Sequence, residues 1–461
     1  MKVNRFVPLL FLLGILLASA TIDLNNLLNY ANQTKPVYIT KNNTPANNQI
    51  SNAGATLGRV LFYDKNLSAN NTIACASCHQ QQFAFGDTAK LSVGLNGGLT
   101  GRHSMRLINA KFGVESKFFW DERATSLEDQ TTKPIQDHVE MGYSGTSGQE
   151  DLNDLIVKLQ SIDYYNTLFK FVYGDSIITE TRIQNSLAQF IRSIQSFDSK
   201  FDQGLMAAGN LNANFSNFTT EENAGKTLFL APPNQNGAGC QGCHRAPEFD
   251  IDPNTLNNGV IAAAGSTTTL DLTNTKAPTL RDLFNPNGSL NGHLMHNGNF
   301  NNLLAVINHY NLVPQNPNNN NLDPRLQGPG GNLQLTETEK NALVAFIKTL
   351  TGTDVYSNEK WSNPFDANGN LDLIPLTTGI AETKKLAFSI FPNPTSDFIY
   401  FNAEAGYYNI LIFDFSGKQI ESITCFGNQK IDISHFNKGT YLLSVRDLKT
   451  QNIKTEKIIK K

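Results

Sequence analysis

The sequences Cys75-Ala76-Ser77-Cys78-His79 and Cys240-Gln241-Gly242-Cys243-His244 decide the fold of most of this chain. Each has the form Cys-x-x-Cys-His, and together they use four of the five cysteines. In this pattern two thiols bond to the vinyl groups of a porphyrin, and the adjacent histidine reaches the iron. The repeated pattern therefore predicts two covalently bound c-type haems, with His79 and His244 as proximal iron ligands.

Other uses of paired cysteines fit this spacing less well. A zinc ribbon places its cysteine pairs about 15–20 residues apart, whereas 165 positions separate Cys75 from Cys240. A thioredoxin-type dithiol has no use for a histidine directly after both second thiols. A framework of structural disulfides seldom repeats one five-residue pattern. These patterns favour haem over zinc, a redox dithiol or disulfides.

The first 20 residues have the pattern of a secretory signal peptide. Lys2 and Arg5 supply a positive start, residues 6–17 an apolar run, and Ala18-Ser19-Ala20 a small-residue cleavage site. The run is shorter than the about 20 apolar residues that a membrane span needs. We therefore expect an exported protein. The formal net charge of −3 argues against a nucleic-acid partner, because phosphate binding needs a basic face.

A chain of 461 residues predicts roughly three domains, at about 100–200 residues each. Short helical patterns separated by polar loops are typical of small haem c domains. We predict a mainly α region of two cytochrome c-like haem domains with long loops, residues 45–205 and 206–352. Residues 366–385 have the composition of a linker. Alternating apolar residues beyond it predict an all-β sandwich over residues 386–461.

The predicted sandwich resembles the type A sorting domain of the type IX secretion system. The resemblance depends on Phe391-Pro392-Asn393-Pro394, Ser416-Gly417, Gly439-Thr440-Tyr441, Lys457, Lys460 and Lys461. It implies recognition by the type IX machinery and passage from the periplasm to the cell surface or beyond. A carbohydrate-binding or adhesive module is the alternative.

Residues 50–352 resemble the bacterial di-haem cytochrome c peroxidase and MauG family. Besides the haem motifs, the matching strings are Phe118-Phe119-Trp120-Asp121-Glu122-Arg123-Ala124, Ser126-Leu127-Glu128-Asp129-Gln130, Pro134-Ile135, Glu140-Met141-Gly142, Ala277-Pro278-Thr279-Leu280-Arg281 and His296-Asn297-Gly298. The resemblance implies a peroxidatic haem in the N-terminal domain and an electron-transfer haem in the C-terminal domain.

The resemblance also implies three catalytic residues. Glu140 is placed over the first haem, where a carboxylate can move a proton between the two peroxide oxygens; a surface carboxylate is the alternative. Trp120 lies between the haems as a bridge for electrons, and a large core aromatic is the alternative. Phe119 shapes the apolar pocket for peroxide.

The sixth ligand of the first iron decides its reactivity. In relatives that rest in an inactive state, a histidine after Ser92-Val93-Gly94 blocks this iron, and Leu95 stands at that position here. Leucine cannot bind iron, so we expect an open iron that needs no prior reduction. His103 remains an alternative ligand.

For the second haem, the resemblance aligns Tyr310 with the methionine ligand of the electron-transferring peroxidases, a ligand that raises the potential. A tyrosinate would lower it, as in the MauG branch. Tyr310 is therefore the candidate axial ligand. His309 and Met295 are alternatives close in sequence.

The family also binds calcium between the haems through an asparagine and loop carbonyls. His103 stands at the asparagine position, and Asn291-Gly292-His293 replaces a threonine and a proline. Calcium takes oxygen ligands, so the imidazole disfavours the site, and backbone carbonyls remain as weak ligands.

Three functions follow from these expectations. The first is a peroxidase that reduces hydrogen peroxide with electrons from a small cytochrome, a cupredoxin or an organic donor. The second is a MauG-like oxidase that modifies a partner protein or small molecule. The third is an extracellular electron carrier without catalysis, which requires two six-coordinate irons. The resemblance is compatible with either a monomer or a homodimer.

Overall fold

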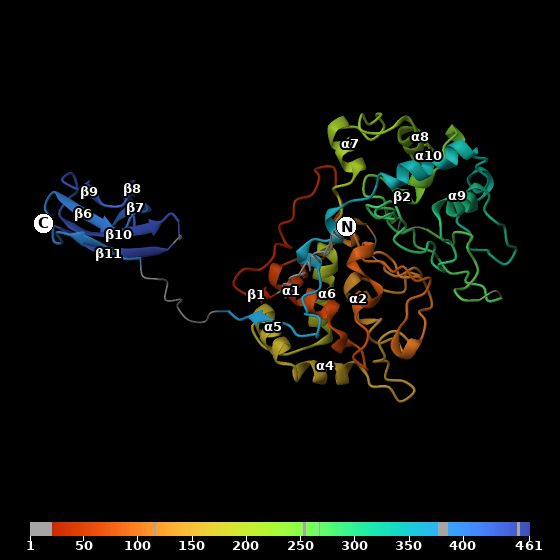
Figure 1. Cartoon of the computed structure of the whole chain (residues 1–461), viewed down its shortest axis with the longest axis horizontal. Helices are drawn as coiled ribbons and strands as arrows, with labels where there is room; N and C mark the ends of the chain where they lie inside the picture. The colour runs from red at the N-terminus through yellow and green to blue at the C-terminus, as the bar shows by residue number, and fades with distance from the viewer. Residues whose placement is uncertain (1–20, 115–116, 252–254, 267, 377–385, 450–451) are drawn as a thin grey trace, which may run out of the picture. The chain divides into compact units, whose positions relative to one another are not determined.

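The structure is a computed structural model that describes residues 21–114, 117–251, 255–266, 268–376, 386–449 and 452–461. The predicted signal peptide lies outside the described residues. The chain divides into two compact units, Met1–Pro375 and Leu376–Lys461. Figure 1 shows a first unit of helices and long loops and a second unit of strands.

Helices dominate the described part of the first unit. They are α1 (Asn52–Tyr63), α2 (Cys75–Cys78), α3 (Leu127–Thr132), α4 (Leu152–Gln160), α5 (Asp163–Tyr173), α6 (Glu180–Ser193), α7 (Lys200–Ala208), α8 (Thr220–Leu230), α9 (Leu303–Asn311) and α10 (Glu337–Lys348). Short strands are β1 (Ile22–Asp23), β2 (His244–Arg245), β3 (Asp250–Ile251) and β4 (Leu373–Ile374). Capping boxes begin α8 at Thr219 and α10 at Thr336, where the hydroxyl and the third-residue carboxylate satisfy free backbone N–H groups.

The first unit contains two similar helix pairs. In each pair, one haem motif lies in the chain segment between the two helices. In the first pair α1 packs on α6, and in the second α8 packs on α10. A Cβ on Gly58 would lie 2.0 Å from the Ser186 carbonyl oxygen, and one on Gly225 would lie 1.9 Å from that of Ala342. Each glycine therefore lets two helix backbones approach more closely than any side chain allows.

Each pair is the centre of its own buried apolar cluster. The first cluster is built on α1, α4, α5 and α6 and includes Phe62, Phe190 and Trp361. The second is built on α7, α8 and α10 and includes Phe229 and Phe346. The first unit thus has two apolar cores, and its division into two haem domains between residues 205 and 206 stays a prediction.

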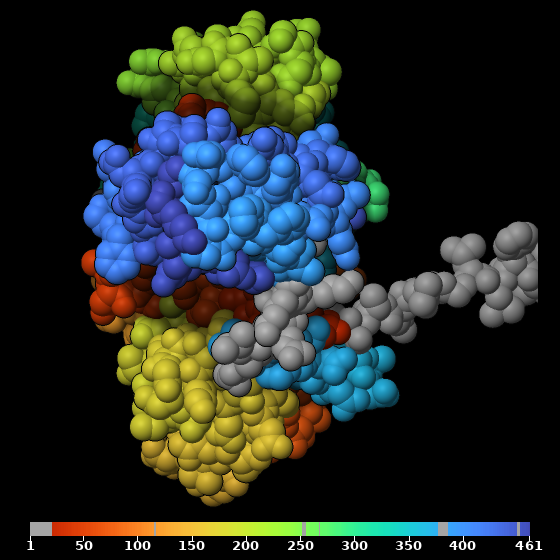
Figure 2. Space-filling view, turned by 90° about the vertical axis from the view of Figure 1, so that its left-hand side faces the viewer, coloured from red at the N-terminus to blue at the C-terminus, as the bar shows by residue number. Residues whose placement is uncertain are grey.

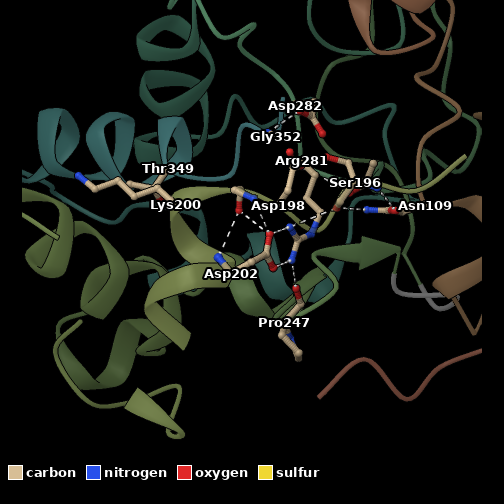
Figure 3. A network of polar contacts seen from close by, with 12 residues as sticks. Asn109, Ser196, Asp198, Lys200, Asp202, Pro247, Arg281, Asp282, Thr349 and Gly352 are labelled. Carbon is tan, nitrogen blue, oxygen red and sulfur yellow. Dashed lines mark hydrogen bonds and ion pairs between the residues drawn. The ribbon is translucent and has the colours of Figure 1, made fainter. Parts of the chain in front are cut away.

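A buried ion pair fastens α7 to the loops of the second cluster (Figure 3). Arg281 makes a two-pronged contact with Asp202, with both N–O distances at 2.8 Å, and donates to the Pro247 carbonyl at 2.8 Å. Arg281 is fully buried and Asp202 nearly so. The guanidinium offsets the desolvation of Asp202 and holds the pKa of that carboxyl below its usual value. Arg281 of the family string therefore has a structural role.

The predicted linker differs from the structure over its first ten residues. Phe365 bridges to Leu371, and Leu373–Ile374 pairs in parallel with Ile22–Asp23. Residues 366–375 thus belong to the first unit, because this pairing satisfies their backbone groups. Residues 377–385 lie outside the described residues.

The second unit is a two-sheet structure with a small apolar core, and its strands form one closely packed body in the space-filling view (Figure 2). One sheet has the order β11-β10-β7-β8 and the other β5-β6-β9. The strands are β5 (Phe388–Phe391), β6 (Phe398–Ala403), β7 (Tyr407–Asp414), β8 (Gln419–Phe426), β9 (Gln429–Asp432), β10 (Gly439–Asp447) and β11 (Ile453–Lys460). Alternate residues such as Ile410, Ile412, Leu443 and Val445 are fully buried, as predicted from the period-two pattern. No described helix in either unit is long and apolar enough to cross a membrane.

Candidate active site and haem cavities

The first haem motif lines a cavity of about 600 Å³. Cys75 and Cys78 lie on the one-turn helix α2, which brings both thiols and His79 to the same wall. His79 Nδ1 lies 3.2 Å from the Phe85 carbonyl oxygen, so the ring donates there and leaves Nε2 for a metal. Burial raises the pKa of Cys75 to about 12, as expected in an apolar pocket. These residues fit a covalently bound haem.

Glu140 lines the same cavity as His79. Asp137 begins the turn before it, because its Oδ1 accepts from the backbone N–H of Val139 at 2.8 Å and of Glu140 at 3.0 Å. Burial, together with the nearby Asp137 charge, raises the pKa of Glu140 to about 7, although Arg123 acts against the shift. Among the described residues no side chain bonds to this carboxylate, so it can exchange protons near neutral pH.

The loop that carries Leu95 holds Glu140 in place. The Leu95 N–H lies 2.7 Å from the Val139 carbonyl oxygen and 3.1 Å from that of Glu140. A Cβ on Gly94 would lie 2.3 Å from the Val139 oxygen and 2.9 Å from the Glu140 Cα. Leu95 itself is buried and is absent from the described lining of the cavity. The loop therefore supports the backbone beside the carboxylate, and the open sixth position of the first iron stays a prediction.

Phe119 and Arg123 form another part of this wall. The Arg123 guanidinium lies 3.6 Å from the centroid of the Phe119 ring, and both residues line the cavity. Arg123 also pairs with Asp121 at 2.9 Å. The stack fixes the Phe119 ring against the cavity and keeps a positive charge close enough to influence Glu140.

The second haem motif lines a separate cavity of about 940 Å³. Cys240, Cys243 and His244 lie on its wall, where the motif passes from a 3-10 turn into β2. Burial lowers the pKa of His244 to about 4, so the imidazole is neutral and able to bind a metal. Burial also raises the pKa of Cys240 to about 12. This wall fits a second haem.

Tyr310 and Met295 both reach the second cavity, and His309 does not. The Asn258 amide nitrogen lies 3.5 Å from the Tyr310 hydroxyl and 3.6 Å from the Met295 sulfur. His309 Nε2 instead lies 2.9 Å from the Asn258 carbonyl oxygen. Burial raises the pKa of Tyr310 above its ordinary value. The phenol therefore stays protonated unless its oxygen binds a metal cation. Two of the three candidate ligands therefore remain.

Trp120 lies in the wall that the two cavities share, which also contains residues 103–106, Lys276 and Pro278. Its indole N–H donates to the His103 carbonyl at 2.7 Å, and its own carbonyl accepts from the Lys276 N–H at 2.9 Å. The His296 ring lies edge-on to the indole, with 6.2 Å between centroids. The structure thus places Trp120 where an aromatic group can connect the two cavities.

The position predicted for calcium does not fit that ion. His103 Nδ1 lies 3.1 Å from the carbonyl oxygens of Ala89 and Lys90, and burial lowers the pKa of His103 to about 4. A neutral ring must carry its proton on Nδ1 to satisfy these carbonyls, so an N–H group occupies the space that a cation would take.

Sequence reasoning missed Asp137, Asn258 and the supporting role of Gly94. The Asp-x-x-Glu spacing of Asp137 and Glu140 was visible as a turn signal. Asn258 lies 37 and 52 residues from its two partners, and no local signal connects them.

Comparisons with known proteins agree with this geometry. A family described as di-haem cytochrome c peroxidase matches residues 52–210, and one described as the secretion system C-terminal sorting domain matches residues 389–461. The methylamine utilization protein MauG of Methylophilus methylotrophus is 32% identical over 314 residues, which cover 67% of this chain and 85% of the relative. The cytochrome c551 peroxidase of Nitrosomonas europaea is 28% identical over 356 residues, 74% of this chain and 89% of the relative.

A solved structure has the same fold as the first unit. It is that of a MauG-like protein associated with microbial copper homeostasis, with a TM-score of 0.58 and 26% identity. The match covers 72% of this chain and 99% of the other. The long loops and short helices of the first unit are thus those of a known architecture.

Proposed function

This chain belongs to the di-haem cytochrome c peroxidase and MauG family, and on that premise we propose that it reduces hydrogen peroxide to water outside the cytoplasm. The C-terminal unit is a sorting domain of the type IX secretion system, which indicates export to the cell surface or beyond. The observation that carries the proposal is the Glu140 carboxyl in the cavity of the first haem motif.

Cys75 and Cys78 would hold the first haem and His79 would ligate its iron, which would supply the site where peroxide binds. Glu140 takes up a proton from the incoming peroxide and returns it to the departing oxygen, so that water leaves. A carboxyl group whose pKa is near neutrality can both accept and donate this proton. Phe119 and the apolar cavity wall keep bulk water from competing for the proton.

His244 would ligate the iron of the second haem, which would supply the two electrons that each peroxide needs. Trp120 would connect the cavities through their shared wall. A small cytochrome, a cupredoxin or a reduced organic molecule is the donor. The overall reaction consumes one peroxide, two electrons and two protons and forms two waters.

Turnover by the purified holoprotein tests this proposal. Peroxide consumption is followed with a reduced small cytochrome, a reduced cupredoxin and an organic donor in separate assays. The proposal predicts oxidation of two equivalents of one-electron donor per peroxide, without a reductive activation step. It is wrong if a protein loaded with two haems turns over peroxide with none of these donors.

A second candidate is oxidation of a partner protein or small molecule, as the MauG relatives suggest. The Tyr310 hydroxyl at the second cavity favours it, because a phenolate ligand lowers an iron potential relative to a thioether. A low-potential second haem would draw electrons less readily from a cytochrome. The identity of the second haem's sixth ligand therefore separates the two functions.

A further inference from the structure

The wall between the haem cavities contains Arg106, a cation that forms no ion pair among the residues that the structure describes. It lines both cavities. Its Nη2 donates to the Thr279 carbonyl at 3.0 Å, and its Nε is buried without a hydrogen-bond partner. Among the described residues no carboxylate forms an ion pair with this guanidinium. The side chain therefore presents unused donors at the wall shared by both sites.

Arg106 packs against the loop that follows His79 and bonds to the segment that contains Pro278 and Thr279. A Cβ on Gly86 would lie 2.9 Å from the Arg106 Cγ, so this glycine makes room for the arginine stem. Gly86 follows Phe85, whose carbonyl oxygen lies 3.2 Å from His79 Nδ1. On the other side, the Thr279 carbonyl follows Pro278, which lines both cavities.

The nearest acidic group compensates the guanidinium only at a distance. Asp282 acts on Arg106 electrostatically, but no ion pair joins the two side chains. The Asp282 Oδ1 accepts from the Gly352 N–H at 2.8 Å and from the Tyr356 hydroxyl at 3.1 Å, and its Oδ2 is buried without a hydrogen-bond partner among the described residues. The other cation of the wall is Lys276, whose ammonium group donates a hydrogen bond to the Lys117 carbonyl oxygen. Of the two, Arg106 is the one that lines both cavities with a donor, Nε, that has no hydrogen-bond partner among the described residues.

A buried guanidinium requires an anion, because its desolvation is costly unless a charge and hydrogen bonds replace water. Its planar donors match a carboxylate, which accepts two of them at once. The propionates are the carboxylates that a haem brings into its cavity. A haem in either cavity can therefore supply the partner that the protein does not.

We propose that Arg106 is the shared cation of the two haems, pairing with a propionate at the wall and raising the reduction potential of both irons. This inference rests on the two-haem assignment of the proposed function. Ferric iron carries one more positive charge than ferrous iron, so a fixed cation disfavours the oxidised state. The effect is strong where the effective dielectric constant is low.

Spectroelectrochemical titration of the holoprotein tests the proposal. Arg106→Gln should lower the midpoint potentials of both haems, and Arg106→Lys should keep both nearer to wild type. Arg446→Gln removes an exposed cation from β10 of the second unit and should change neither. A fall in only one midpoint of Arg106→Gln, or in neither, overturns the shared role.

If the Arg106→Gln variant does not incorporate its haems, a second measurement still tests the proposed pairing. Resonance Raman spectra of Arg106→Lys should show shifted propionate bending bands, because an ammonium group cannot make the two-pronged contact. Bands identical to wild type overturn the pairing. A wild-type protein with fewer than two haems would instead contradict the proposed function, which haem content reports independently.

Discussion

The two halves of the first unit share a scaffold and differ in what their cavities present. Both have a helix pair that crosses at a glycine, Gly58 or Gly225, and both bring a Cys-x-x-Cys-His motif to a cavity wall. The first cavity holds Glu140, a carboxyl group that no described side chain binds. The second holds Tyr310 and Met295. We therefore expect the shared scaffold to account for haem binding, and we propose that these few side chains account for the difference in reactivity.

The largest expected effect comes from removing the carboxylate that distinguishes the first cavity. Glu140→Gln keeps the shape of the side chain but cannot accept a proton, so kcat for peroxide should fall about 10²–10⁴-fold, the contribution typical of general acid–base catalysis. Stopped-flow peroxide assays measure it. The control Glu221→Gln alters an exposed carboxylate of α8 and should leave kcat unchanged. Equal kcat values for Glu140→Gln and wild type would contradict the proposal that Glu140 makes the first cavity the reactive one.

The next effect concerns the second cavity alone. Tyr310→Phe removes the candidate ligand oxygen, so the spectrum of the second haem should change from low-spin to high-spin while that of the first stays the same. His309→Gln is the matched control, since His309 bonds to the Asn258 carbonyl and lies outside the cavity lining. If Met295→Leu changes the spin state of the second haem and Tyr310→Phe does not, the axial ligand is the methionine.

A smaller effect is expected on the pH profile. Glu140 must be ionised to accept the first proton, and its pKa is raised to about 7. Thus kcat/KM for peroxide should rise with pH up to about 7 and then level. Asp137→Asn keeps the oxygen that accepts from Val139 and Glu140 but removes a negative charge, so the rising limb should move to lower pH. If the rising limb of the Asp137→Asn profile lies at the same pH as that of wild type, the group that titrates is not Glu140.

The smallest expected effect is that of calcium removal. Because a His103 N–H group meets the carbonyls of Ala89 and Lys90, the wall between the cavities needs no cation there. Treatment with EGTA should leave turnover and both haem spectra unchanged, and metal analysis should find no stoichiometric calcium. One calcium per chain with activity lost on chelation would contradict this assignment.

The sequence predicted the features that depend on local patterns. The haem motifs, the capping boxes at Thr219 and Thr336, and the alternating core of the second unit are each contained in a few consecutive residues.

What the sequence could not predict depends on residues far apart in the chain. The pairing of β1 with β4 joins positions about 350 apart, and it placed part of the predicted linker in the first unit. Arg106 had no motif of its own, because its significance comes from two cavities meeting at one wall. Even the choice among Tyr310, Met295 and His309 required knowing which side chains reach the cavity.

Low-temperature electron paramagnetic resonance of the fully oxidised holoprotein tests the central difference between the two cavities most directly. We expect one high-spin ferric signal, from a first iron without a protein ligand opposite His79, and one low-spin signal from a six-coordinate second iron. Two low-spin signals, unchanged by added peroxide, would contradict it and favour an electron carrier.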